Sequence, residues 1–278
     1  MRPDAAAVVL CLAGLSGQAG GAPASPAQSP PAPQQAAAQA AAPAAVPNCP
    51  ELATALSALM RNDARVRDWP NLARYRDANR TLAAPSSGAP RVVFMGDSIT
   101  DSWPQPRFGD MFARKGYVGR GISGQTTPQM LVRFRPDVID LKPRVVVILA
   151  GTNDIAGNTG AMTNEEIQGN LASMSELAKA NGIRMVLSSI LPVSAYHTAP
   201  NAVPQTTARP MDRIAALNDW MKKHAAAHGH VYLDYFSAMV DDKGLLRQEL
   251  SADDLHPNAQ GYAVMEPLAE AAILQAVR

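Results

Sequence analysis

Cysteine, aromatic residues and charge are all scarce in this chain of 278 residues. Its two cysteines, Cys11 and Cys49, are too few for a disulfide framework or a cysteine-based zinc site. Aromatic residues make up 5% of the chain and charged residues 18%, with a formal net charge of +1. A nucleic-acid-binding domain usually shows a basic excess, so this balance argues against a nucleic-acid partner and against a polybasic lipid-binding face.

The first 48 residues differ in composition from the rest of the chain. A short apolar run over residues 5–15 follows Arg2 and precedes a group of small residues. The run is too short for a transmembrane segment, which takes about 20 apolar residues. It matches a secretory signal peptide, which we place at residues 1–24, with an unstructured alanine-rich leader as the alternative. Residues 25–48 are rich in alanine and proline and predict a disordered linker, so we expect a secreted or periplasmic protein.

The folded domain is therefore predicted at residues 49–278. Apolar residues recur at helical spacing in residues 52–59 and again in residues 69–78. We expect residues 49–90 to form an N-terminal helical extension whose short helices pack onto the main domain.

Apolar, β-branched runs alternate with helical patterns through the remainder. The runs lie at residues 92–95, 117–118, 145–149, 185–187 and 231–233, and the helical patterns are clearest at 165–180, 211–227 and from 259 towards 272. Continuous apolar strands separated by helices are typical of parallel strands buried on both faces. We predict an α/β protein, a three-layer α/β/α sandwich with a parallel sheet of about five strands. Its ligand site should lie at the carboxyl ends of the strands.

Three polar clusters directly follow three of these predicted strands. Ser98, in GDSIT, would open a helix with an exposed hydroxyl and a free backbone N–H, although a simple helix cap is the plainer interpretation. Gly124, in GISGQTT, would let the backbone approach a ligand closely, or would only make a turn. Asn153, in GTND, offers an amide donor of the kind that stabilises an oxyanion, or caps a turn.

A fourth cluster, DDLHPN, lies near the C-terminus. Asp253 and His256 are close enough in sequence to face one site within a tight turn. His256 would act as general base and Asp253 would orient its ring, whereas a lone histidine before proline is more often a loop residue. Asp254 is the competing carboxylate, and we expect it to point elsewhere.

Together the four clusters resemble the SGNH, or GDSL, family of serine esterases over roughly residues 90–278. The resemblance implies a flavodoxin-like sheet, the SGNH hydrolase fold, with Ser98 as nucleophile beside Asp253 and His256. It also implies an oxyanion hole made by the Ser98 and Gly124 N–H groups and the Asn153 side chain. Residues 151–159 are most similar to the branch that contains platelet-activating-factor acetylhydrolase.

We therefore expect an enzyme that hydrolyses carboxylic esters, with short-chain acyl (acetyl) esters, including acetylated saccharides, as its small-molecule substrates. Lysophospholipase or longer-chain acylhydrolase activity is the alternative, and a catalytically silent carbohydrate-binding protein on the same fold is a further one. Residues 192–210 form a loop long enough to be functional, and we expect it to wall the pocket, with Tyr196 and His197 touching substrate.

Neither a metal nor a cofactor is expected. His224 and His228 are four residues apart on a predicted helix and could face one metal ion. Position 225 is alanine, however, so the His-Glu-x-x-His pattern of zinc proteases is absent and we expect exposed histidines.

Overall fold

The computed structural model describes residues 49–85, 88 and 90–278. The predicted signal peptide and linker, residues 1–24 and 25–48, lie outside the described residues. Within the described part of the chain, no helix is long and apolar enough to cross a membrane.

A five-stranded sheet forms the centre of the fold, in the order β2-β1-β3-β4-β5 with every neighbouring pair parallel. The strands are β1 (Val92–Gly96), β2 (Val118–Gly121), β3 (Val145–Leu149), β4 (Arg184–Ser188) and β5 (Val231–Leu233). β1 and β3 are buried along their whole length, as continuous apolar strands require. The predicted parallel sheet of about five strands is confirmed, and its order is that of flavodoxin-like folds.

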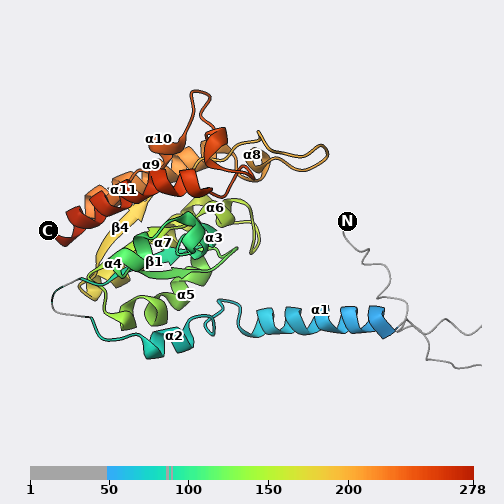
Figure 1. Ribbon diagram of the computed structural model, residues 1–278, viewed down its shortest axis with the longest axis horizontal. Coiled ribbons are helices and arrows are strands. Elements are labelled where there is room, and N and C mark those ends of the chain that lie inside the picture. Colours follow the sequence, from blue (N-terminus) through green and yellow to red (C-terminus); the bar gives the residue numbers. More distant parts are fainter. Residues whose placement is uncertain (1–48, 86–87, 89) are drawn as a thin grey trace, which may run out of the picture. The chain divides into compact units, whose positions relative to one another are not determined.

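Helices cover both faces of this sheet (Figure 1). One face packs against α5 (Thr127–Asp137), α7 (Asn164–Ala180) and α9 (Met211–His228). The other packs against α3 (Ser98–Ser102), α4 (Met111–Lys115), α10 (Phe236–Met239) and α11 (Ala259–Val277). Shorter elements are α6 (Thr152–Ile155), α8 (Gln205–Ala208) and the 3-10 turns η3 (Pro106–Phe108), η4 (Ile139–Leu141) and η5 (Gln248–Leu250).

β1, β3 and β4 each contribute side chains to two hydrophobic cores, because successive strand residues point to opposite faces. In β1, Val93 and Met95 belong to the core under α5, α7 and α9. Val92 and Phe94 belong to the core under α3, α4 and α11. Each of these side chains is at most 2% exposed, and full burial of one such side chain contributes about 1.5–3 kcal/mol. The predicted three-layer sandwich is thereby confirmed.

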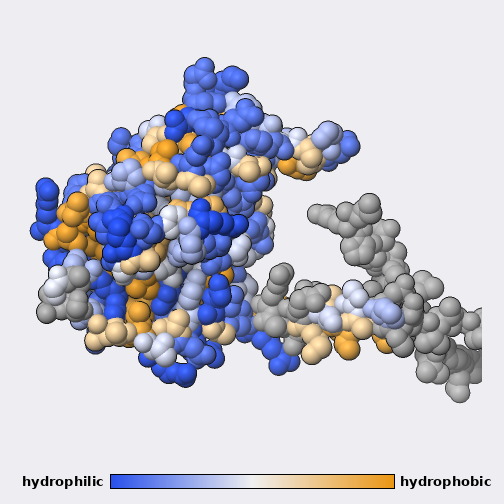
Figure 2. Space-filling model, viewed as in Figure 1, coloured by the Kyte–Doolittle hydropathy of each residue, from blue (hydrophilic) through white to orange (hydrophobic). Residues whose placement is uncertain are grey.

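The N-terminal extension differs from its prediction in two respects, the first of which concerns its long helix. α1 (Cys49–Arg67) is helical, but Leu52, Leu56 and Leu59 along it are 57%, 56% and 66% exposed. Orange and tan residues accordingly lie along α1 in the space-filling view (Figure 2). The expectation that this helix packs onto the main domain is wrong, because helical spacing of leucines predicts a helix and not its partner.

The second predicted helix of the extension is largely replaced by turns. The structure has turns up to Tyr75 and a short helix, α2 (Arg76–Thr81). The Asp68 carboxylate accepts hydrogen bonds from the N–H groups of Leu72 and Ala73 at 2.7 and 2.9 Å. Asn71 takes the left-handed conformation, with φ of +57°. Both features interrupt the helical backbone where the apolar spacing continues.

Candidate active site

Ser98 directly follows β1 and is the first residue of α3. Asp97 is the N-cap, and its carboxylate accepts the N–H of Ile99 at 3.0 Å. The first amides of a helix have no acceptor within the helix, so the Ser98 N–H faces the end of the sheet without one. Gly96 is required for this sharp turn, since a Cβ there would lie 2.2 Å from Thr100 Oγ1 and 2.7 Å from the Leu149 carbonyl.

The loop before α11 brings His256 to Ser98. The Ser98 Oγ lies 2.9 Å from His256 Nε2, and His256 Nδ1 lies 2.7 Å from Asp253 Oδ2. The other oxygen of Asp253 accepts the N–H groups of His256 and Leu255, at 2.7 and 3.1 Å. With a proton on Nδ1 donated to the carboxylate, His256 accepts the serine hydroxyl proton at Nε2.

The Asp253 carboxylate is held in its charged form. Partial burial works to raise its pKa, but hydrogen bonds from the ring and the backbone of His256 outweigh burial and keep the pKa below the usual range. A carboxylate that stays ionised at neutral pH can stabilise the imidazolium that forms when His256 takes a proton.

Gly124 lies in the loop that follows β2, and Asn153 lies in α6, the short helix that follows β3. Gly124 has φ of +78°, and its carbonyl accepts a hydrogen bond from Asn158 Nδ2 at 3.0 Å. Asn153 donates one amide hydrogen to the Gln125 carbonyl at 3.0 Å. A side-chain amide has two hydrogens, so a second remains for a ligand. These two segments lie at the same sheet edge as the end of β1, because all five strands are parallel.

The model of the GDSL-like Lipase/Acylhydrolase family matches residues 94–264. The chain belongs to this family. Membership assigns it to the carboxylic ester hydrolases and confirms the resemblance on which the sequence prediction rested.

Solved structures share the fold of this GDSL-like hydrolase. A Bacteroides fragilis protein described as an acylhydrolase is 45% identical, with a TM-score of 0.68 over 76% of this chain and 99% of its own. A protein from Streptococcus pneumonia described as a platelet activating factor is 25% identical, with a TM-score of 0.61 over 78% and 98%. A Geobacillus acetyl-xylooligosaccharide esterase is 21% identical, with a TM-score of 0.54 over 69% and 96%, which is a likeness of fold alone.

Curated relatives align over shorter stretches. Esterase TesA of Pseudomonas aeruginosa is 32% identical over 120 residues, which is 39% of this chain and 58% of TesA. The lipoprotein YqeF of Bacillus subtilis is 36% identical over 79 residues, 27% of this chain and 32% of YqeF. The chain thus spans less than two thirds of these two relatives.

Arg209 is a site residue that the sequence analysis missed. Its side chain is buried beneath the long loop of this hydrolase, with Nε 2.9 Å from Thr152 Oγ1 and Nη2 3.4 Å from Asn153 Oδ1. Burial lowers the pKa of Arg209, while the charges of Asp97 and Asp253 act in the opposite direction. A buried cation therefore lies beside the proposed oxyanion donor, and an arginine in a loop carries no motif that would have predicted it.

Arg133 is a second residue without a sequence signal. It is fully buried in α5 and pairs with Asp137 at 3.1 Å. Its guanidinium donates to the Gly96 carbonyl at 3.0 Å and also to the side chain of Gln125. One side chain thus joins the turn before Ser98 to the loop that carries Gly124.

Asp97 is fully buried, and one of its carboxylate oxygens has no hydrogen-bond partner within the described part of the chain. Burial raises the pKa of Asp97 to about 6, although the Ile99 N–H and the nearby charges of His256 and Arg209 oppose that change. Ser98 is thus preceded by a buried carboxyl group whose pKa is raised by burial.

Asp254 points away from His256, as expected. It adopts φ of +68° and is buried. Its carboxylate accepts hydrogen bonds from Ser194 Oγ at 2.6 Å, from Thr198 Oγ1 at 3.1 Å and from the N–H of His197 at 2.9 and 3.0 Å. The adjacent carboxylates therefore serve two different parts of the chain.

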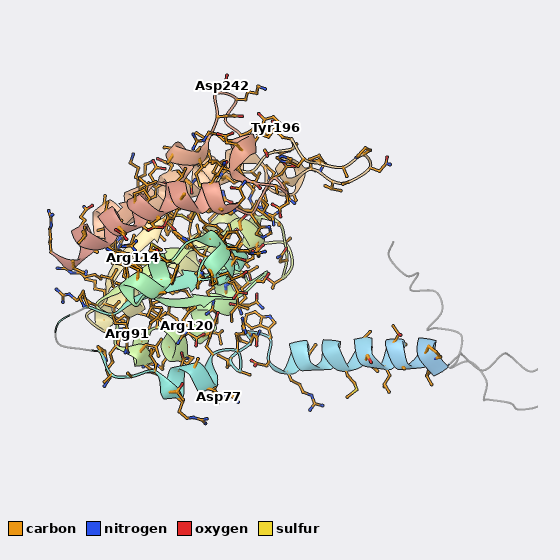
Figure 3. All side chains as sticks on the ribbon, viewed as in Figure 1. Asp77, Arg91, Arg114, Arg120, Tyr196 and Asp242 are labelled. Carbon is orange, nitrogen blue, oxygen red and sulfur yellow. The ribbon has the colours of Figure 1, made fainter. Side chains whose placement is uncertain are left out.

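Both predicted substrate-contacting side chains are hydrogen-bonded within the protein. His197 Nδ1 lies 3.1 Å from Asp254 Oδ1. Tyr196 donates its hydroxyl proton to Asp241 Oδ2 at 2.5 Å and lies close to Asp242 (Figure 3). The hydrogen bond to Asp241 raises the pKa of Tyr196 to about 12. Their contact with substrate stays a prediction.

A groove of about 810 Å³ opens beside Gly124. Its lining comes from the turn after α1, the loop after β2, α5 and the loop after α6: Asp68, Trp69, Asn71, Ala73, Ile122, Ser123, Gly124, Gln125, Gln129, Asn158 and Thr159. Seven of these eleven residues are polar, and Trp69, Ala73 and Ile122 supply apolar surface among them.

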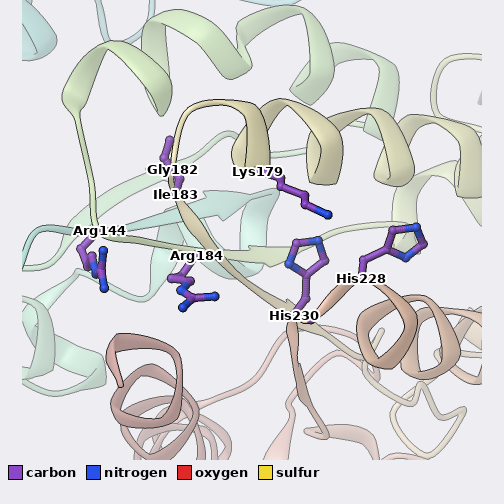
Figure 4. Close-up of a pocket in the computed structure, with 8 residues that line it drawn as sticks. Arg144, Lys179, Gly182, Ile183, Arg184, His228 and His230 are labelled. Atoms are coloured by element: carbon purple, nitrogen blue, oxygen red, sulfur yellow. The ribbon is translucent and has the colours of Figure 1, made fainter.

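The histidines of α9 lie at the other end of the sheet. A cavity of about 300 Å³ there is lined by His228, His230, Arg144, Lys179 and Arg184, among others (Figure 4). Arg184 begins β4, so this is the amino end of the parallel strands, opposite the end that carries Ser98. The rings of His224 and His228 stack at 4.1 Å, and among the described residues no group of three or more potential ligands is placed to hold a metal ion.

Proposed function

We propose that this hydrolase cleaves short-chain acyl esters, acetyl esters above all, through an acyl-enzyme formed on Ser98. The observation that carries the proposal is the continuous hydrogen-bonded path from Ser98 Oγ through His256 to Asp253, with steps of 2.9 and 2.7 Å. Such a path is what an activated serine nucleophile needs.

In the first half of the reaction, Ser98 Oγ bonds to the ester carbonyl carbon as His256 Nε2 takes the hydroxyl proton. The tetrahedral intermediate collapses when the carbon–alkoxide bond breaks, and His256 returns the proton to the departing alcohol. In the second half, His256 takes a proton from water, and the hydroxide adds to the acyl carbon. Ser98 Oγ then leaves and regains the proton, which releases the carboxylic acid.

The carbonyl oxygen becomes an oxyanion in both halves. The N–H groups of Ser98 and Gly124 and the free amide hydrogen of Asn153 are the donors that we propose for it. Removing one such donor typically costs about a hundredfold or more in turnover. The Arg209 cation beside Asn153 Oδ1 adds favourable charge to the same place.

The lining of the groove beside Gly124 supports short acyl groups. A long hydrocarbon chain gains about 0.8 kcal/mol for each buried CH₂ group only where it meets apolar surface. In this groove the apolar surface at Trp69, Ala73 and Ile122 is interrupted by amide, hydroxyl and carboxylate groups. We therefore propose acetyl esters of polar alcohols as substrates, and the fold shared with an acetyl-xylooligosaccharide esterase is compatible with them.

Replacing the nucleophile tests the mechanism. Ser98→Ala should lower kcat for 4-nitrophenyl acetate about a thousandfold or more and should abolish covalent labelling by a fluorophosphonate. Ser173→Ala, which removes a hydroxyl from α7, is the matched control and should keep both. Retained hydrolysis in purified Ser98→Ala would rule out the mechanism, and a chain-length series from acetyl to decanoyl esters tests the acyl preference.

We further propose that Tyr196 and His197 border the entrance to the site. His197 hydrogen-bonds to Asp254, the neighbour of Asp253, so the loop and the triad share one support. Equal relative rates of Tyr196→Phe and His197→Ala across a panel of esters with different alcohols would contradict this role.

We also propose that residues 1–24 direct export. The short apolar run behind Arg2 and the likeness to a lipoprotein support export, since lipoproteins are exported proteins.

A further inference from the structure

The groove beside Gly124 joins the N-terminal extension to the proposed oxyanion site. Trp69 and Asn71 line one side, and Ser123, Gly124 and Asn158 line the other. Gly124 belongs both to this lining and to the proposed oxyanion donors. A group bound in the groove would thus border the oxyanion that we propose at Gly124.

Trp69 is fixed in place by its backbone while its ring remains accessible. Gln129 Nε2 donates to the Trp69 carbonyl at 2.7 Å, and Gln125 Nε2 donates to the Pro70 carbonyl at 2.7 Å. Pro70 is buried, whereas Trp69 is 41% exposed. The side chain that is usually withdrawn from water is here held at the edge of a polar groove.

Exposed polar groups line the same groove as Trp69. Within the described part of the chain, three of them have no hydrogen-bond partner in the protein: the side-chain amide of Asn71, Ser123 Oγ and Asn158 Oδ1. An accessible aromatic face bordered by free donors and acceptors matches a pyranose ring. The C–H groups of such a ring stack on tryptophan while its hydroxyls exchange hydrogen bonds at the rim.

The groove fits the alcohol arm of the ester better than the acyl arm. Its apolar residues, Trp69, Ala73 and Ile122, alternate with polar residues around the groove, as suits a sugar ring with apolar faces and a rim of hydroxyl groups. At about 810 Å³ the groove is larger than an acetyl group needs and is of the size that holds a drug-sized ligand.

We propose that this groove is a saccharide subsite, with Trp69 as the stacking platform for the sugar that carries the acetyl ester. The subsite rests on the proposed function, because it places the sugar relative to an ester that reacts at Ser98. It adds the substrate class, an O-acetylated oligosaccharide, and the N-terminal extension as the element that recognises it.

The test compares two substrates in each variant: an O-acetylated xylotriose and 4-nitrophenyl acetate, which carries no sugar. In Trp69→Ala the ratio of kcat/KM for the xylotriose ester to that for the aryl ester should fall about tenfold, chiefly through KM, as expected for loss of one aromatic contact. Trp69→Phe should keep the ratio within about threefold. Leu72→Ala removes a neighbouring side chain that does not line the groove, and should leave the ratio unchanged.

An unchanged ratio in Trp69→Ala would overturn the subsite, and so would a wild-type enzyme that cleaves the aryl ester but not the xylotriose ester. The proposed function survives both results, and fails only if Ser98→Ala keeps its activity. Unmodified xylotriose provides a measurement that needs no variant. It should inhibit wild-type hydrolysis of the aryl ester competitively at millimolar concentration, and absence of inhibition at 50 to 100 times that level, about 0.1 M, would also overturn the subsite.

Discussion

Arg209 is the residue through which the long loop reaches the proposed oxyanion donor. Arg209→Met removes the charge and the hydrogen bonds to Thr152, Asn153 and Gln205, while keeping a side chain of similar length. We expect kcat to fall about tenfold to a hundredfold with KM within about twofold, because the loss is felt as charge develops on the oxyanion. The kcat of Arg209→Lys should lie between those of the wild type and Arg209→Met.

The control is Arg213→Met, since Arg213 binds Asn164 and the Met162 carbonyl instead. The kcat and KM of both variants are measured by steady-state kinetics with 4-nitrophenyl acetate. A kcat for Arg209→Met equal to that of the wild type would show that Asn153 is oriented without it.

Asp97 should make stability depend on pH. Its pKa is about 6 in the folded protein against 3.8 as the ordinary value, so between these values the folded state binds more protons than the unfolded state. Its contribution is therefore most favourable below pH 4 and becomes unfavourable as pH rises through 6, by about 3 kcal/mol in full. Asp97→Asn keeps a cap oxygen for Ile99 and removes the charge.

Relative to the wild type, Asp97→Asn should gain stability on going from pH 4 to pH 8, measured as the difference in free energy of unfolding by urea. Asp110→Asn, at a position that is 77% exposed, is the control and should show no such trend. A difference between Asp97→Asn and wild type that is constant from pH 4 to pH 8 would contradict the assignment.

At the scale of single residues, much of the candidate site could be predicted from the sequence, for a physical reason. Ser98, Gly124 and Asn153 each directly follow a strand, and parallel strands deliver such residues to one edge. Arg209 and Arg133 act through long side chains that reach elements distant in sequence. No local pattern marks where an arginine side chain ends, so only the structure reveals them.

Among the elements, α2 is held to the main domain by one asparagine. Asn79 Nδ2 donates to Asp137 at 2.7 Å and to the Pro136 carbonyl at 3.0 Å, and Asn79 Oδ1 accepts from Arg120 Nε at 2.8 Å. Asn79→Ala leaves buried polar groups without partners. We expect a loss of about 1–3 kcal/mol in the free energy of unfolding, measured with urea.

Arg80→Ala is the matched control on the same helix, because Arg80 is 75% exposed and pairs only at the surface, with Asp77. It should change stability by less than about 0.5 kcal/mol. Equal losses in the two variants would mean that α2 is not anchored through Asn79.

The elements also show where sequence patterns lose information. The spacing at 165–180 and 211–227 predicted α7 and α9 well, since those helices bury their apolar side chains against the sheet. The same spacing at 52–59 lies in α1, whose leucines are exposed, and at 69–78 it lies mostly in turns. Periodicity reports an apolar face, whereas capping by Asp68 and the left-handed Asn71 decide whether a helix forms there.

At the scale of the whole molecule, every residue that we assign to the reaction lies between 69 and 256. A variant that lacks residues 1–48 should therefore keep the kcat and the thermal midpoint of the full chain, because the described residues from 82 to 277 form two hydrophobic cores. The measurement is differential scanning calorimetry together with hydrolysis of 4-nitrophenyl acetate.

A shorter truncation, which lacks only residues 1–24, tests export. With the proposed signal peptide, the enzyme should be recovered outside the cytoplasm of an expressing bacterium, and without residues 1–24 it should remain inside. Equal distribution of the two forms would contradict the signal peptide, while leaving the active site untouched.

The two adjacent aspartates before His256 limit the mutations that this active site can tolerate. Asp253 and Asp254 carry the same carboxylate group. A shift of the loop by one residue would therefore place Asp254 beside His256 in place of Asp253. It would also remove the Asp254 carboxylate from Ser194, His197 and Thr198. The left-handed conformation of Asp254 fixes the register of the loop, so that the two carboxylates point in different directions. Asp254 therefore cannot replace Asp253 without loss of the hydrogen bonds that hold the loop. Single-residue insertions or deletions between 253 and 256 should be far more damaging than substitutions there.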